Sequence, residues 1–91
     1  MDSWPTKDPD EVLDYAVNWA DVLVVGETIA SSTFTLAAGD VVIGSTPLSG
    51  AVATVWLSGG TPGTVSQITN HIVTSASREY EKTVRIRVRS L

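Results

Sequence analysis

The chain has no cysteine, one histidine and no long apolar run among its 91 residues. Without cysteine it has no disulfide bond, no thiolate nucleophile and no sulfur-ligated zinc site. No segment approaches the roughly 18 unbroken apolar residues of a membrane-spanning helix, and the first residues lack the basic start and apolar stretch of a secretory signal. We therefore expect a protein that is made and kept in a cytoplasm and is stabilised by packing alone.

The composition favours a single all-β domain. Hydrophobic residues make up 43% of the chain and charged residues 18%, a balance typical of a compact domain, and a chain of this length seldom holds two cores. Val, Ile and Thr account for 29 of the 91 residues. Their branched side chains are restricted in a helix and pack well on a pleated sheet, so we predict an all-β fold.

Alternation of apolar and polar residues predicts strands over residues 13–19, 28–36, 41–45, 51–58 and 64–74, with a last strand after a turn at 75–77. In the last strand Tyr80, Val84, Ile86 and Val88 share the inward face, and Thr83, Arg85, Arg87 and Arg89 point outward. The glycine-rich residues 59–63 are predicted to close a hairpin between their flanking strands. This pattern predicts a small antiparallel β-sandwich of immunoglobulin-like shape, with a partly open barrel as the alternative.

Residues 1–11 are predicted to form an extended N-terminal arm ahead of a sandwich domain at residues 12–91. Pro5 and Pro9 lack a backbone donor and force the preceding residues into extended conformations. Trp4 lies on this arm, where an uncovered indole is costly, so we expect a neighbour, in this chain or in another subunit, to cover it. In the alternative, the arm folds back as the first edge strand of its own sandwich.

Charge is unevenly distributed along the chain. Residues 1–40 carry eight acids against Lys7 alone, a net charge of −7, whereas residues 41–91 carry five bases against two acids, a net charge of +3. The basic C-terminal strand lacks the interleaved aromatics that stack on nucleic-acid bases, and the whole chain, at −4, repels phosphate. We predict no nucleic-acid or membrane partner and expect the oppositely charged ends to attract each other or neighbouring copies.

Groups suited to catalysis are few. His71 lies in mid-strand, where a solvated or hydrogen-bonded side chain is the expected role. Asp8, Asp10 and Glu11 begin like a calcium loop, but the downstream glycine and bidentate glutamate of that loop are missing. The glycines at 59–63 lead into a strand and not a helix, so they form no phosphate-binding loop. We expect no catalytic residue, no metal and no cofactor, and hence no enzyme.

The features that remain are suited to binding other proteins. An exposed tryptophan is a common anchor of an interface, and charged edges select partners. Trp19 shares the face of the apolar residues of its strand, whereas Trp56 is predicted to lie on an outer face or at an interface. The predicted partner-binding residues are Trp4, Pro5, Asp8, Asp10, Glu11, Trp56, Arg85, Arg87 and Arg89.

Several segments of the chain resemble a family of small tailed-phage and prophage proteins described as fiber–tail adaptors. The distinctive ones are Lys-Asp-Pro-Asp-Glu at residues 7–11 and Trp-Leu-Ser-Gly-Gly-Thr-Pro-Gly-Thr at residues 56–64. The resemblance extends through residues 12–15, 18–19, 26–29, 69–74 and 85–88, and so covers nearly the whole chain. This chain departs from the family where an aromatic is expected at Ser66 and where a glycine is expected in the turn at residues 76–78.

The resemblance implies a non-enzymatic virion component that docks on the tail or neck, or on portal-associated proteins, and connects it to fibers or neighbouring proteins. Copies of the chain are expected to form a symmetric ring in the virion, after assembly in the host cytoplasm. The alternative is a phage head decoration or cement protein, because such proteins are also small β-sandwiches with arms.

Overall fold

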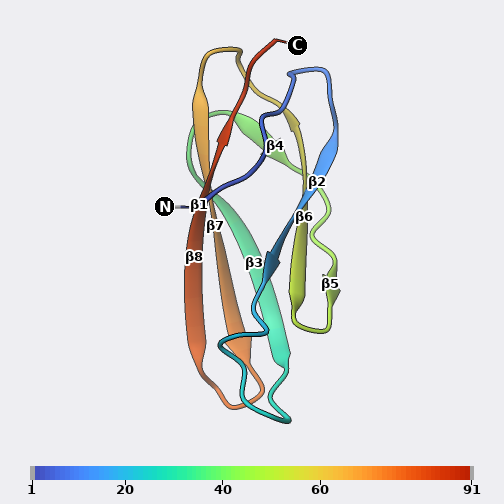
Figure 1. Cartoon of the computed structure of the whole chain (residues 1–91), viewed down its shortest axis with the longest axis vertical. Coiled ribbons are helices and arrows are strands. Elements are labelled where there is room, and N and C mark those ends of the chain that lie inside the picture. Colours follow the sequence, from blue (N-terminus) through green and yellow to red (C-terminus); the bar gives the residue numbers. More distant parts are fainter. Residues whose placement is uncertain (1, 91) are drawn as a thin grey trace.

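The computed structural model describes residues 2–90 as strands joined by turns and loops (Figure 1). Strand boundaries follow the sequence alternation closely, as expected where one side of each strand is buried. The strands are β1 (Asp2–Ser3), β2 (Leu13–Asn18), β3 (Ile29–Ala38), β4 (Val41–Ile43), β5 (Leu48–Ser49), β6 (Val52–Gly59), β7 (Val65–Thr74) and β8 (Glu79–Arg87).

The strands form two sheets that pack face to face. Sheet 1 has the order β1-β8-β7-β3, and sheet 2 has the order β2-β6-β4, with β5 also paired to β6. All pairs are antiparallel except β1 with β8, which run parallel. The predicted all-β sandwich is therefore confirmed, with one parallel pair added at the edge of sheet 1.

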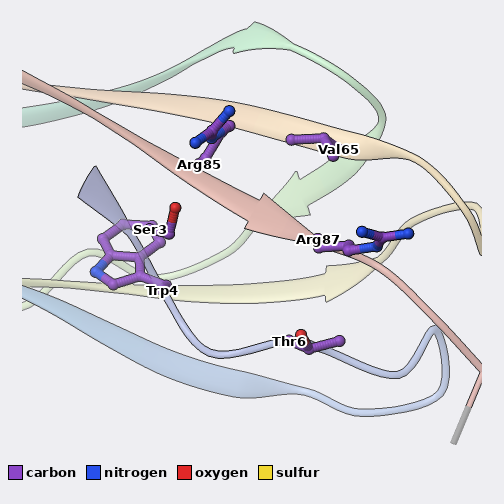
Figure 2. Close-up of a pocket in the computed structure, with 6 residues that line it drawn as sticks. All are labelled: Ser3, Trp4, Thr6, Val65, Arg85 and Arg87. Atoms are coloured by element: carbon purple, nitrogen blue, oxygen red, sulfur yellow. The ribbon is translucent and has the colours of Figure 1, made fainter. Parts of the chain in front are cut away.

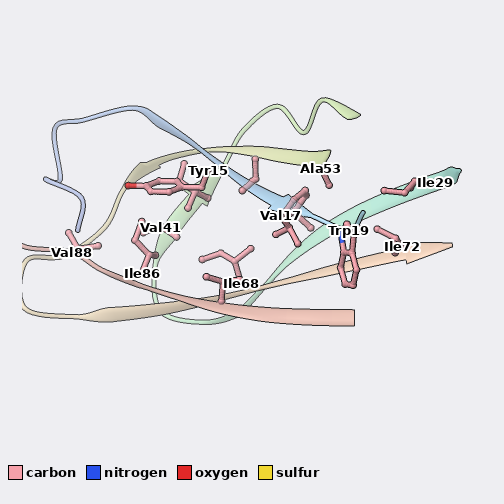
Figure 3. Packing of buried hydrophobic residues seen from close by; sticks show 14 residues of the cluster. Tyr15, Val17, Trp19, Ile29, Val41, Ala53, Ile68, Ile72, Ile86 and Val88 are labelled. Carbon is pink, nitrogen blue, oxygen red and sulfur yellow. The ribbon is translucent and has the colours of Figure 1, made fainter. Parts of the chain in front are cut away.

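The core lies between the sheets, where Figure 3 shows the buried side chains. Val84, Ile86 and Val88 are buried and Arg85 and Arg87 are exposed, so the predicted faces of the last strand are confirmed. The same alternation buries one side of β2, β6 and β7. The buried apolar residues are Tyr15, Val17, Trp19, Ile29, Phe34, Val41, Ala53, Val55, Leu57, Ile68, Ile72, Val84, Ile86 and Val88.

The predicted hairpin at residues 59–63 is wrong. β6 belongs to sheet 2 and β7 to sheet 1, so this segment crosses from one sheet to the other. A side chain at Gly60 would bring its Cβ within 2.7 Å of a Val88 methyl group, and the amide of Gly63 donates to the Val88 carbonyl at 2.8 Å. Turn residues indicate where the chain reverses, but they do not say which sheet receives the next strand.

A buried asparagine joins the two sheets. Asn70 on β7 is 1% exposed, and its Oδ1 accepts a hydrogen bond from Trp19 Nε1 at 2.8 Å. Its Nδ2 donates to Ser32 Oγ at 2.9 Å on the neighbouring β3. A buried amide is tolerated only when its polar atoms have partners, so this network fixes how Trp19 and β3 sit relative to β7.

The two departures from the family pattern have local structural consequences. Ser66 is fully buried, and Gly39 approaches it so closely that a Cβ at Gly39 would lie 2.1 Å from Ser66 Oγ. The small side chain of Ser66 is therefore covered by the turn before β4. In the turn before β8, Ser77 has φ of +63°, a left-handed conformation that favours glycine.

Polar contacts fasten loops at each end of the sandwich. Glu27 accepts a hydrogen bond from Thr74 Oγ1 at 2.6 Å, and Arg78 lies 3.5 Å from the same carboxylate. These contacts hold the loop before β3 to the turn between β7 and β8. Asp40 accepts hydrogen bonds from the amide and hydroxyl of Thr61, which ties the turn before β4 to the crossover segment. Among residues 2–90 the structure offers no helix with the length and apolar character needed to span a lipid bilayer.

Candidate functional site

The N-terminal segment, residues 2–7, lies along β8 of its own chain. The amides of Trp4 and Lys7 donate to the carbonyls of Arg85 and Arg87 at 2.9 and 3.0 Å, and the amide of Arg89 donates back to the Lys7 carbonyl at 3.0 Å. The segment is extended, as the prolines predict, and it pairs with β8 as the edge strand of its own sandwich, which is the alternative to a free arm. An extended segment can pair with an open sheet edge, and β8 supplies that edge.

Trp4 closes the edge of the sandwich. Its indole stacks on Tyr15 of β2 with ring centroids 5.1 Å apart, and its Nε1 donates to the Ala16 carbonyl at 3.3 Å. The neighbour that covers Trp4 is therefore the second sheet of the same chain. Of the two expected kinds of neighbour, in this chain or in another subunit, the structure places one from this chain against the indole.

Lys7 fastens the N-terminal segment to the crossover segment. Its side chain is fully buried, and its Nζ donates to the carbonyls of Asp8 at 2.7 Å and Gly59 at 2.8 Å. A buried amine needs such acceptors. The two sequence segments that carry the family resemblance, residues 7–11 and 56–64, thus meet at one end of the sandwich.

The acidic residues after Lys7 form a compact turn. The Asp8 amide donates to Glu11 Oε1 at 2.9 Å, and the Asp10 amide donates to Asp8 Oδ1 at 2.8 Å. Two of the three predicted partner-binding carboxylates therefore organise the turn itself, while the side chain of Asp10 is exposed.

A groove on the outer face of sheet 1 brings three of the predicted partner-binding residues together. Figure 2 shows Arg85 and Arg87 on β8 beside the N-terminal segment. The groove has a volume of about 350 Å³. Within residues 2–90 neither arginine makes an ion pair, so both guanidinium groups are available to a partner. We call this the arginine groove; it is lined by Ser3, Trp4, Thr6, Val65, Arg85 and Arg87.

Trp56 lies on the opposite side of the molecule, on the outer face of sheet 2, and is 38% exposed. Its cross-strand partner on β2 is Asp14, which is also exposed. On its other side Gly44, which has no side chain, donates its amide to the Trp56 carbonyl at 2.7 Å. We call Trp56 and Asp14 the tryptophan face; the predicted outer-face position of Trp56 is confirmed.

The remaining predicted positions lie outside both surfaces. Pro5 is exposed beside the arginine groove, and Arg89 is exposed just beyond β8. Sequence reasoning missed Ser3, Thr6 and Val65 as groove-lining residues and Lys7 as a structural anchor. The one available signal was that Lys7 is the only base among the first 40 residues; the groove itself exists only because the N-terminal segment docks on β8.

His71 lies between two glutamates on the outer face of sheet 1. Its Nδ1 is 3.2 Å from Glu81 Oε1, and its Nε2 is 2.9 Å from Glu79 Oε1. The hydrogen bond with Glu81, followed by the one with Glu79, raises the pKa of His71 above its ordinary value of 6.5. The expected role of a hydrogen-bonded strand histidine is confirmed.

We expect nuclear magnetic resonance titration of His71 to give a midpoint above 6.5, because both carboxylates favour the imidazolium. Because the pKa of His71 is raised in the folded state, its contacts with the two glutamates stabilise the fold fully below about pH 6.5. This stabilisation is lost as pH rises through the pKa of the folded state. Glu81→Gln and Glu79→Gln should each lower the midpoint. A midpoint at or below 6.5 in the wild-type chain would contradict this arrangement.

The fold and these surfaces define a small β-sandwich whose distinctive chemistry lies on its two outer faces. A family model described as podophage GP4 fiber-tail adaptor protein gp77 matches residues 7–87. The chain belongs to this family, as the sequence resemblance predicts. A comparison with curated proteins gives no match.

Proposed function

We propose that this protein is a non-enzymatic structural component of a phage virion that docks on the tail or neck and gives fibers an attachment surface. The family match over residues 7–87 carries this proposal. The structure supports it with a sandwich fastened at both ends and with two exposed faces of different chemistry. In this role the protein is a rigid spacer with binding faces, and its location is the tail region of the particle.

The proposed partners are tail, neck or portal-associated proteins, fibers, and copies of the same chain in a symmetric ring. The arginine groove, with the exposed Pro5 beside it, and the tryptophan face are the surfaces that we assign to these contacts. The net charge of −4 opposes binding to the phosphates of nucleic acid or of an anionic membrane. We propose that the chain folds in the host cytoplasm before it joins the particle.

Particles assembled without this protein test the proposal. We expect these particles to contain heads and tails but to lack fibers, since an adaptor is needed to attach the fibers and not to assemble the head or the tail. Electron microscopy with fiber counts, and addition of the purified chain to the defective particles, provide the measurement and its control. Particles that keep their fibers without the protein would contradict the adaptor role.

A further inference from the structure

The two outer faces of the sandwich carry complementary features. The arginine groove on sheet 1 presents two arginines without ion pairs among residues 2–90, next to the edge of Trp4 and the apolar Val65. The tryptophan face on sheet 2 presents an indole beside an exposed carboxylate. The arginine groove supplies positive charge, and the tryptophan face supplies an indole and a negative charge.

We propose that the tryptophan face of one copy docks in the arginine groove of the next copy. This inference deepens the proposed self-association and rests on it. In this contact the Trp56 indole occupies the groove between the two guanidinium groups, and Asp14 pairs with one of them. The contact is head-to-tail, because different faces of the two copies meet.

The chemistry of the groove suits an indole. Guanidinium groups stack on aromatic faces, and tryptophan is the most favourable partner in such cation–π contacts. A volume of about 350 Å³ lies near the lower limit of small-ligand pockets, roughly 300–1,000 Å³, which is the scale of a single large side chain. Val65 is 43% exposed and offers the apolar surface that an indole covers.

Charge complementarity favours a second copy over nucleic acid as the occupant. Asp14 lies directly opposite Trp56 on the neighbouring strand. Docking of the Trp56 indole therefore also brings the Asp14 carboxylate toward the groove. The acids concentrate in residues 1–40 and the bases in residues 41–91, so one chain carries both the acidic and the basic side of the contact. A head-to-tail contact builds a ring when its rotation closes, as the ring proposed for the adaptor requires.

Stable complexes bury about 800 Å² per partner, which would take nearly a whole face of a molecule that measures 43 × 20 × 17 Å. A contact between the groove and the tryptophan face covers only part of each face, so association of the purified chain is expected to be weak in solution. Sedimentation velocity over concentrations up to about 1 mM at low salt is the appropriate measurement. Added salt should weaken the association, because exposed charges are screened.

Substitutions of exposed residues test each face separately. Trp56→Ala and Arg85→Glu should each weaken self-association at least tenfold, as expected for interface anchors. The matched controls are Leu48→Ala, whose side chain is 39% exposed on β5, and Arg89→Glu, which makes the same charge change outside the groove. Both controls should stay within about twofold of the wild-type chain, and circular dichroism should show that every variant is folded.

A mixing experiment distinguishes the head-to-tail contact from a symmetric one. Trp56→Ala keeps a working groove and Arg85→Glu keeps a working tryptophan face, so an equal mixture should form dimers although each variant alone is monomeric. The double variant Asp14→Arg/Arg85→Glu should recover part of the lost association.

Four results would overturn the proposal. Two concern association itself: a wild-type chain that is monomeric up to about 1 mM, or a mixture that stays monomeric. The third is loss of fiber attachment in Arg85→Glu with self-association unchanged, which would assign the groove to a different protein and leave the adaptor role intact. The fourth is retention of nucleic acid by the wild-type chain at physiological salt that is lost in Arg85→Glu. Loss of fibers from particles that lack the protein is measured separately, so failure of this inference is distinguishable from failure of the proposed function.

Discussion

Ile86→Asp is expected to leave the isolated domain unfolded. Ile86 on β8 is fully buried in the core, and its neighbour across the sheet is Ser66, which offers no positive charge. Burial of an unpaired carboxylate costs several kcal/mol, a large part of the roughly 5–15 kcal/mol by which small domains are stable. Far-ultraviolet circular dichroism and thermal melting provide the measurement.

The control is Arg87→Ala, one residue further along the same strand. The Arg87 side chain is exposed in the arginine groove, and its backbone carbonyl, which accepts from the Lys7 amide, is kept in the variant. Its free energy of unfolding should change by less than about 0.5 kcal/mol. If the Arg87 variant unfolds and the Ile86 variant does not, the two faces of β8 have been assigned the wrong way round.

Deletion of residues 1–7 is expected to destabilise the isolated domain severely. The deletion removes the stacking of Trp4 on Tyr15, the pairing with β8 and the buried side chain of Lys7. Each lost backbone hydrogen bond costs about 1 kcal/mol, and the exposed edge and the uncovered Gly59 carbonyl add to this, so the sum is several kcal/mol. A fall in melting temperature of more than about 10 °C is the expected result.

Single substitutions separate the contributions within this segment. Lys7→Met keeps the aliphatic stem but leaves the carbonyls of Asp8 and Gly59 without their donor, and should cost about 2–4 kcal/mol. Pro5→Ala, at an exposed position, is the matched control and should change stability little. A truncated chain that keeps its melting temperature but no longer joins the particle would show instead that residues 1–7 act on a neighbouring subunit, as an assembly arm.

The strand faces were predictable from the sequence, but the strand partners were not. The period-two alternation separated the two faces of β2, β6 and β7 and identified the inward residues of β8, because burial of one side is a local property of a strand. The hairpin at residues 59–63 was predicted wrongly because the destination of a turn depends on contacts such as that of Gly60 with Val88, which lie far apart in the sequence.

In the candidate site, too, the strand faces were predictable from the sequence and the long-range contacts were not. The common outward direction of Arg85 and Arg87 followed from alternation, and the exposure of Trp56 followed from its neighbours Val55 and Leu57. The groove did not follow, because it depends on where residues 3–6 dock. The role of Lys7 was also hidden, since its acceptor at Gly59 lies 52 positions away and an isolated lysine is usually exposed.

If this chain connects fibers to the phage tail, electron cryomicroscopy of the intact particle, at a resolution that separates β-sheets, will locate it there. We expect density for the two-sheet domain, 43 Å long, between the tail or neck and the base of each fiber. Density for this domain on the capsid surface, with none at the fiber bases, would instead show a head decoration protein.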